Sequence, residues 1–149
     1  NSLKKKIGTG GAGTVDLKAL ERAEQVIADM TESYLDWVAE DLKKIDQAYA
    51  KLEVATGDRK EEMEAVFEIS HDIKGQGGTF GYDLMTAIAT ELCRLIEKAE
   101  KIGDEEVEVV KLHITALKLV IDEDMKGQGG KAGKKMLAGL QQVCDKLLA

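Results

Sequence analysis

The stretch that decides the fold is residues 70–81, which read Ser-His-Asp-Ile-Lys-Gly-Gln-Gly-Gly-Thr-Phe-Gly. If it is helical, Lys74, Gly75 and Gly78 surround the imidazole of His71, because residues three, four and seven apart share a helix face. Each glycine inside a helix costs about 0.5–1 kcal/mol relative to alanine. One use for a bare helix surface is close approach by another backbone. A reachable histidine beside a fixed positive charge suits a carrier of phosphoryl groups.

The pattern His71-x-x-Lys74-Gly75-x-x-Gly78-x-x-Gly81 resembles the signature of histidine-containing phosphotransfer (HPt) domains of multistep two-component signalling. The match covers the signature's His, Lys and three Gly positions, and the helical pattern of residues 31–148 is similar to the bundle of that family. The resemblance implies that His71 accepts a phosphoryl group from a receiver-domain phospho-aspartate and passes it to another receiver. It implies that Lys74 stabilises the phosphoryl oxygens and that Gly75 and Gly78 admit the receiver.

Composition limits the classes of protein to consider. The 149 residues fit one domain, and 44% hydrophobic with 33% charged residues is a soluble, globular balance. The absence of proline and the 4% of aromatic residues favour long helices over a β-sandwich. A net charge of −7 argues against a general nucleic-acid binder. No apolar run is long enough for a membrane span, and we expect a cytoplasmic protein.

We predict an all-α fold, an antiparallel four-helix bundle core with an additional N-terminal helix. Residues 1–14 are predicted to be a flexible tail or linker, and residues 15–149 the HPt-like domain, because glycines crowd the first segment. Helices are expected to begin near Asp16, at Thr31 or Ser33, and after Asp58, with Asp83 and Asp104 as caps of the next two. A last helix follows residue 135. The expected inner stripes are Leu35, Val38, Leu42, Ile45, Tyr49 and Leu52; Met63, Val66, Ser70, Ile73, Gly77 and Phe80; Leu84, Ile88, Leu92, Leu95 and Ala99; Val107, Val110, Ile114, Leu117 and Ile121; and Leu137, Leu140, Cys144 and Leu147.

Two glycine patterns invite other interpretations. Gly8-x-Gly10-x-x-Gly13 matches a dinucleotide fingerprint, but no buried strand precedes it, so we interpret it as linker. The letters of Lys126–Gly130 repeat those of Lys74–Gly78, with Glu123 where the first copy has its histidine. A duplicated or decoy site is conceivable, but we favour coincidence within a polar loop over residues 122–135. Its charged flanks favour solvated backbone.

Several side chains are assigned from helical phase. The imidazole of His71 is expected at the edge of the buried face or outside it. Its second ring nitrogen needs an acceptor to fix the tautomer, and the spacing does not choose among Thr90, Glu91 and Arg94. His113 is interpreted as structural. The surface on which a receiver docks is expected to be an apolar patch around His71 that includes Phe67, with Met63 or the first helix as further contributors. Cys93 and Cys144 are expected to be reduced, buried thiols without a zinc site.

The resemblance also implies the partners. We expect response-regulator receiver domains, with a hybrid sensor histidine kinase as a further candidate, and a monomer that binds no nucleic acid. Magnesium is expected from the receiver and not from a cofactor site of this chain. No nucleotide-binding signature accompanies the bundle, so we expect a phosphocarrier and not an enzyme.

Other functions stay open on sequence alone. His71 could belong to the histidine-bearing domain of a chemotaxis-type kinase and be phosphorylated by a separate ATP-binding domain. The chain could also be a structural or adaptor bundle, in which the glycines serve only helix packing and His71→Gln changes nothing. Use of His71 as the general base of an enzyme is disfavoured, because no constellation of acid, base and oxyanion donors accompanies it.

Overall fold

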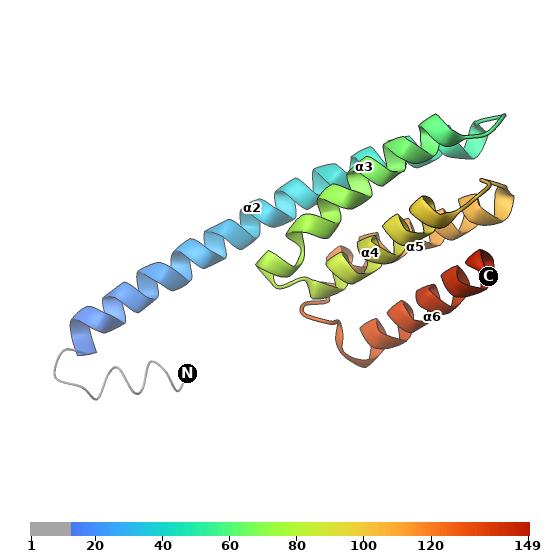
Figure 1. The fold of residues 1–149 in the computed structure, drawn as a ribbon. Helices are drawn as coiled ribbons and strands as arrows, with labels where there is room; N and C mark the ends of the chain where they lie inside the picture. The colour runs from blue at the N-terminus through green and yellow to red at the C-terminus, as the bar shows by residue number, and fades with distance from the viewer. Residues whose placement is uncertain (1–12) are drawn as a thin grey trace. The chain divides into compact units, whose positions relative to one another are not determined.

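The structure is a computed structural model that describes residues 13–149, with side chains from residue 16 onward. Its elements are the α-helices α2 (Gly13–Val54), α3 (Lys60–Gln76), α4 (Asp83–Lys98), α5 (Asp104–Asp122) and α6 (Gly130–Leu148), and the 3-10 helix η1 (Gly78–Phe80) (Figure 1). Over the described residues no strand occurs, and the all-α prediction is confirmed. Of the predicted tail, residues 1–12 lie outside the described residues, and Gly13 already belongs to α2.

The chain divides into two units, residues 1–36 and 37–149, and α2 contributes to both. The sequence led us to expect a new helix at Thr31 or Ser33, and this was wrong, because α2 continues through both positions. The Thr31 hydroxyl donates backward to the Ile27 carbonyl at 2.9 Å and caps nothing. Residues 14–56 contain neither glycine nor proline, so the chain has no strong helix breaker there.

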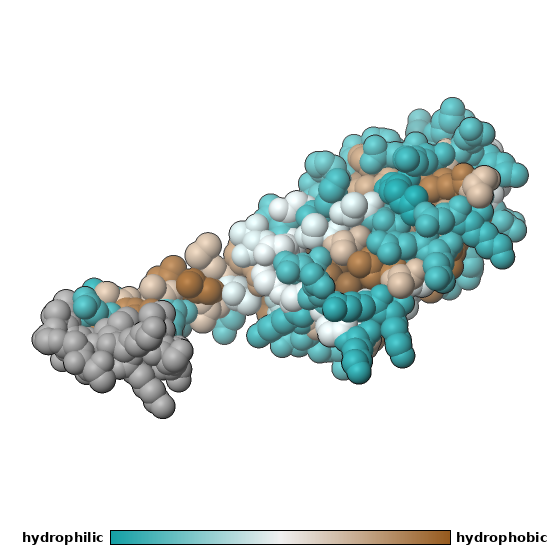
Figure 2. All heavy atoms as spheres, turned by 60° about the horizontal axis from the view of Figure 1, so that its bottom comes forward, coloured by the Kyte–Doolittle hydropathy of each residue, from teal (hydrophilic) through white to brown (hydrophobic). Residues whose placement is uncertain are grey.

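The second unit is a bundle in which successive helices run antiparallel (Figure 1). Its α4 contacts α3, α5 and α6, and the Lys118 ammonium on α5 pairs with the Asp46 carboxylate on α2 at 3.0 Å. The core follows the predicted stripes, and each fully buried aliphatic side chain contributes about 1.5–3 kcal/mol. Hydrophilic side chains cover most of the face of this unit seen in Figure 2. The buried apolar side chains of the predicted stripes are Val38, Leu42, Ile45, Leu52, Met63, Val66, Ile73, Leu84, Ile88, Leu92, Leu95, Val107, Val110, Ile114, Leu117, Leu140 and Cys144.

The helix starts differ in detail from the expected caps. Asp58 precedes α3 as expected, and its Oδ1 accepts from the Lys60 amide at 3.1 Å. Asp83 and Asp104, however, are the first residues of α4 and α5 and cap neither helix. In α5 the role falls to Glu106, whose Oε1 accepts from the backbone N–H three residues earlier at 2.8 Å.

The last loop is shorter than the predicted 122–135, because α6 already begins at Gly130. Gly133 permits this early start, since a Cβ there would collide with the Gln128 carbonyl and lie 2.9 Å from Leu84 Cδ2. The repeated pentapeptide takes two conformations. Its first copy ends α3, whereas in the second copy Gly127, Gly129 and Gly130 all have positive φ. The second copy is therefore not a duplicate of the helical site.

Candidate functional site

The imidazole of His71 is exposed on α3, while its neighbours Ser70 and Ile73 are buried. The buried Ser70 hydroxyl is satisfied within the helix, donating to the Val66 carbonyl at 2.8 Å. The Phe67 ring lies one turn before His71, with centroids 6.0 Å apart and planes tilted by 36°. Among the described residues no hydrogen bond reaches His71. Both ring nitrogens are therefore accessible to a partner.

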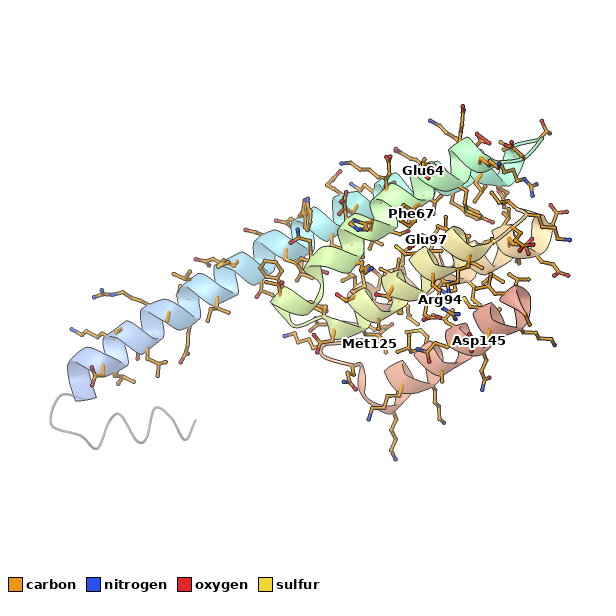
Figure 3. All side chains as sticks on the ribbon, in the orientation of Figure 1. Glu64, Phe67, Arg94, Glu97, Met125 and Asp145 are labelled. Carbon is orange, nitrogen blue, oxygen red and sulfur yellow. The ribbon has the colours of Figure 1, made fainter. Side chains whose placement is uncertain are left out.

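The three candidates for fixing the His71 tautomer are engaged elsewhere, and none of them bonds the imidazole. The Thr90 hydroxyl donates to the Thr86 carbonyl in its own helix at 2.7 Å. The Arg94 guanidinium pairs with Glu91 and with Asp145 of α6, each at 2.8 Å. Figure 3 shows Arg94 and Asp145 pointing toward one another between α4 and α6. Spacing alone could not reveal this, because it does not say which neighbour a face of α4 meets.

Lys74 is half-buried near the end of α3, and within the described part of the chain it forms no salt bridge. Its ammonium lies near Cys93 on α4. Burial raises the pKa of the Cys93 thiol, while the positive charge of Lys74 opposes this rise and Glu97 adds to it. Lys74 thus offers an uncommitted positive charge one turn from His71, as a phosphoryl-binding role requires.

The glycines of the motif separate into two kinds. A Cβ on Gly75 would meet nothing within 4 Å, and one on Gly78 would make only ordinary contacts, the nearest at 3.5 Å from Asp83 Oδ1. Neither glycine is required by packing inside the chain. At Gly77 a Cβ would lie 2.8 Å from the Tyr82 carbonyl oxygen, and Gly81 has a φ of +86°. Gly77 and Gly81 therefore serve the fold, while Gly75 and Gly78 leave open surface beside His71.

Thr86 is a residue of this region that the sequence analysis missed. Its hydroxyl donates to the Lys74 carbonyl and accepts from the Gly78 amide, both at 3.0 Å. It therefore fastens the end of α3 to α4. The only sequence signal was a polar residue midway between the stripe residues Leu84 and Ile88, which is too common to interpret.

Phe67 is half-buried beside His71, where it can contribute to a docking patch. Met63 cannot, because only 2% of it is exposed, and this part of the expectation was wrong. A carboxyl that the sequence analysis overlooked, Asp41 on α2, lies near Asp72. Burial raises the pKa of Asp41, Lys44 opposes the rise and Asp72 adds to it, and Asp41 Oδ2 has no hydrogen-bond partner among the described residues.

A second polar group is buried away from the site, between α5 and α6. His113 is fully buried, and its Nδ1 lies 2.7 Å from the Val109 carbonyl, which assigns the proton to Nδ1. Its Nε2 then accepts from the Cys144 thiol at 3.5 Å. Burial lowers the pKa of His113 and raises that of Cys144 to about 11. Cys93 and Cys144 are both buried and unpaired, and His113 is structural, as predicted.

The described helices offer neither a metal centre nor a membrane span. No group of three or more His, Cys, Asp or Glu side chains in residues 16–149 is arranged to hold a metal ion. None of the helices described is both long enough and apolar enough to cross a membrane.

Comparison with known proteins gives one match. The model of the Hpt domain family matches residues 29–123, which is more than half of the chain. The matched segment contains α3, η1, α4 and all of α5 with the C-terminal part of α2, whereas α6 lies beyond it. Neither the curated proteins nor the solved structures gave a match. The chain belongs to the Hpt domain family, which serves histidine phosphotransfer in two-component signalling.

Proposed function

We propose that this protein is a phosphorelay intermediate, which accepts a phosphoryl group on His71 from a phospho-aspartate of one receiver domain and passes it to another. One observation carries the proposal. His71 is exposed and makes no hydrogen bond in the described part of the chain. Beside it lie Lys74, which forms no salt bridge there, and Gly75 and Gly78, where packing within the fold does not require glycine.

The chemistry follows from these groups. The Nε2 lone pair of a neutral imidazole attacks phosphorus, the nitrogen–phosphorus bond forms, and the bond to the aspartyl oxygen breaks, so that the receiver's carboxylate leaves with the electron pair. The transferred group carries its charge on three outer oxygens, and transfer depends mainly on positioning and charge stabilisation. Lys74 supplies positive charge to those oxygens. Gly75 and Gly78 leave room for the receiver's loops.

The proposed partners are response-regulator receivers, and a hybrid sensor histidine kinase is one proposed source of the phosphoryl group. The proposed location is the cytoplasm. The magnesium needed for transfer comes from the receiver. The phosphocarrier has no ATP site of its own. It receives its phosphoryl group from its partners and does not phosphorylate itself.

The test is transfer from purified receivers that have been charged with a small phosphodonor. We expect the wild type to gain the mass of one phosphoryl group, labile in acid and stable in alkali, and His71→Gln to gain none. Glu64→Gln, an exposed position earlier on α3, is the matched control and should label like the wild type. Labelling only by an added kinase ATP-binding domain would refute the receiver as donor. Equal labelling of His71→Gln would refute His71 as carrier.

A further inference from the structure

The loop between α5 and α6 is hydrogen-bonded to the turn that ends the His71 motif. The Gly127 amide donates to the Gly81 carbonyl at 2.6 Å, and the Leu84 amide donates to the Gly127 carbonyl at 2.8 Å. The Tyr82 hydroxyl donates to Asp124 Oδ1 at 2.5 Å. We call these three hydrogen bonds the clasp. They join residues more than forty positions apart in the sequence.

The clasped turn is itself bonded to the end of α3. The Tyr82 amide donates to the Gly77 carbonyl at 2.9 Å. The Thr86 hydroxyl, one turn into α4, joins the Gly78 amide to the Lys74 carbonyl. A continuous set of hydrogen bonds therefore runs from the α5–α6 loop to the backbone of Lys74, one turn from His71.

The clasp also explains why the second Lys-Gly-Gln-Gly-Gly is rich in glycine. Gly127, which makes two of the three bonds, has a φ of +58°. Gly129 has a φ of +76°, and a Cβ there would lie 2.6 Å from Leu84 Cδ2. Side chains at these positions would strain the loop or push it off the turn. The glycines of this copy keep the loop against α4, which is a different task from that of Gly75.

We propose that the α5–α6 loop is a positioning element of the phosphotransfer site, and that Tyr82 and Asp124 are positioning residues which hold Lys74 and Gly78 in register with His71. The inference rests on the proposed function. Asp124 and Gly127 lie beyond residue 123, where the match to the family model ends. The clasp therefore joins residues outside the matched segment to residues within it.

The two side chains can be changed with little damage to the core. The Asp124 side chain is 61% exposed, so shortening it opens no cavity. Tyr82 is buried, but Tyr82→Phe keeps the ring and removes only the hydroxyl. Asp124→Asn keeps an acceptor oxygen and serves as the conservative rescue. Glu123→Gln, an exposed neighbour whose side chain takes no part in the clasp, is the matched control.

The experiment combines amide hydrogen exchange with transfer kinetics on the whole chain. Tyr82→Phe and Asp124→Ala should each raise the exchange rate of the Gly78 and Gly127 amides by about tenfold, since a hydrogen bond to a carboxylate restrains the turn. Each should slow the maximal rate of transfer to His71 several-fold, with little change in the receiver concentration that gives half of this rate. Asp124→Asn and Glu123→Gln should stay near the wild type. Because both variants break the Tyr82–Asp124 bond, the double variant should be no worse than Asp124→Ala, which also removes the Asp124–Lys126 ion pair and places alanine at a φ of +50°.

The outcomes separate the two proposals. If the wild type takes no phosphoryl group from any receiver, the proposed function fails and the positioning role fails with it. If the wild type is labelled while both variants transfer at its rate, the clasp is only structural and this inference alone is overturned. Unchanged exchange at Gly78 would also overturn it, because the turn would then be held by other contacts.

Discussion

Two alanine substitutions two residues apart, at Gly75 and Gly77, should have opposite effects on stability, and only that at Gly75 should affect receiver binding. In Gly75→Ala the new methyl group meets nothing within 4 Å, and the position is inside α3. Alanine should therefore raise the free energy of unfolding by about 0.5–1 kcal/mol, the helix propensity difference between the two residues. Gly77 follows the last residue of α3, and a Cβ there would lie 2.8–3.0 Å from Tyr82 O, Thr86 Oγ1 and Met85 Cβ. Overpacking of this kind costs about 1–3 kcal/mol, so Gly77→Ala should be destabilised by about 1–2 kcal/mol.

Urea unfolding of both variants gives the stability part of the prediction, and receiver-to-His71 transfer gives the functional part. Gly75→Ala should be more stable than the wild type yet slower in transfer, because the methyl group occupies the surface that the receiver approaches. The loss should appear as a higher half-saturating receiver concentration. Gly77→Ala should lose stability, while its folded fraction should bind the receiver nearly normally.

Two results would refute this reasoning. Wild-type transfer by Gly75→Ala would show that the open surface is not a docking surface. Wild-type stability of Gly77→Ala would show that the contacts with Tyr82 and Thr86 relax without cost, and that packing does not require glycine there.

Three further predictions concern ionisable side chains. Lys74→Met should slow transfer by about tenfold, because a charge-assisted contact to the phosphoryl oxygens is lost. The free energy of unfolding should change little, because no salt bridge is removed. Lys74→Arg should restore most of the rate, and transfer by Lys74→Met at the wild-type rate would contradict this role. Burial raises the pKa of Asp41 above 3.8, so the folded chain holds that proton more tightly and stability is lost as the pH rises through the folded-state pKa. Asp41→Asn should therefore raise the free energy of unfolding at pH 7 by about 1 kcal/mol in denaturant titrations, and a loss of stability would argue against the unpaired carboxyl. Burial lowers the pKa of His113 below 6.5, so the unfolded chain binds more protons and stability falls as the pH falls below 6.5. Between pH 7 and pH 5, His113→Leu should therefore lose less stability than the wild type. An equal loss of stability in both would assign the pH dependence to other groups.

Much of the fold could be predicted because helical periodicity is a local property. The stripes from Val38 to Leu52 and from Leu84 to Leu95 are spaced to one face of a helix, and the structure buries them. The start of α6 could not be predicted, since glycine and lysine around Gly133 favour a loop by local preference. Only close packing of Gly133 against the Gln128 carbonyl and Leu84 favours the helix there.

The sequence by itself determined the helical class, the exposed edge on which His71 lies, and the positions of Lys74 and Gly75 beside it, because these follow from spacing along one helix. Gly78 lies beyond the end of α3, in η1, and the tertiary structure places it. Only the tertiary structure decided which glycines serve the fold and which leave open surface, since that depends on what α4 brings against Gly77 and leaves away from Gly75. The two copies of the pentapeptide differ in conformation, helical before Gly78 and left-handed at Gly127, as their flanking residues predicted. Only the structure gives the reason for glycine in the second copy, since Gly127 and Gly129 have positive φ and a Cβ on Gly129 would meet Leu84.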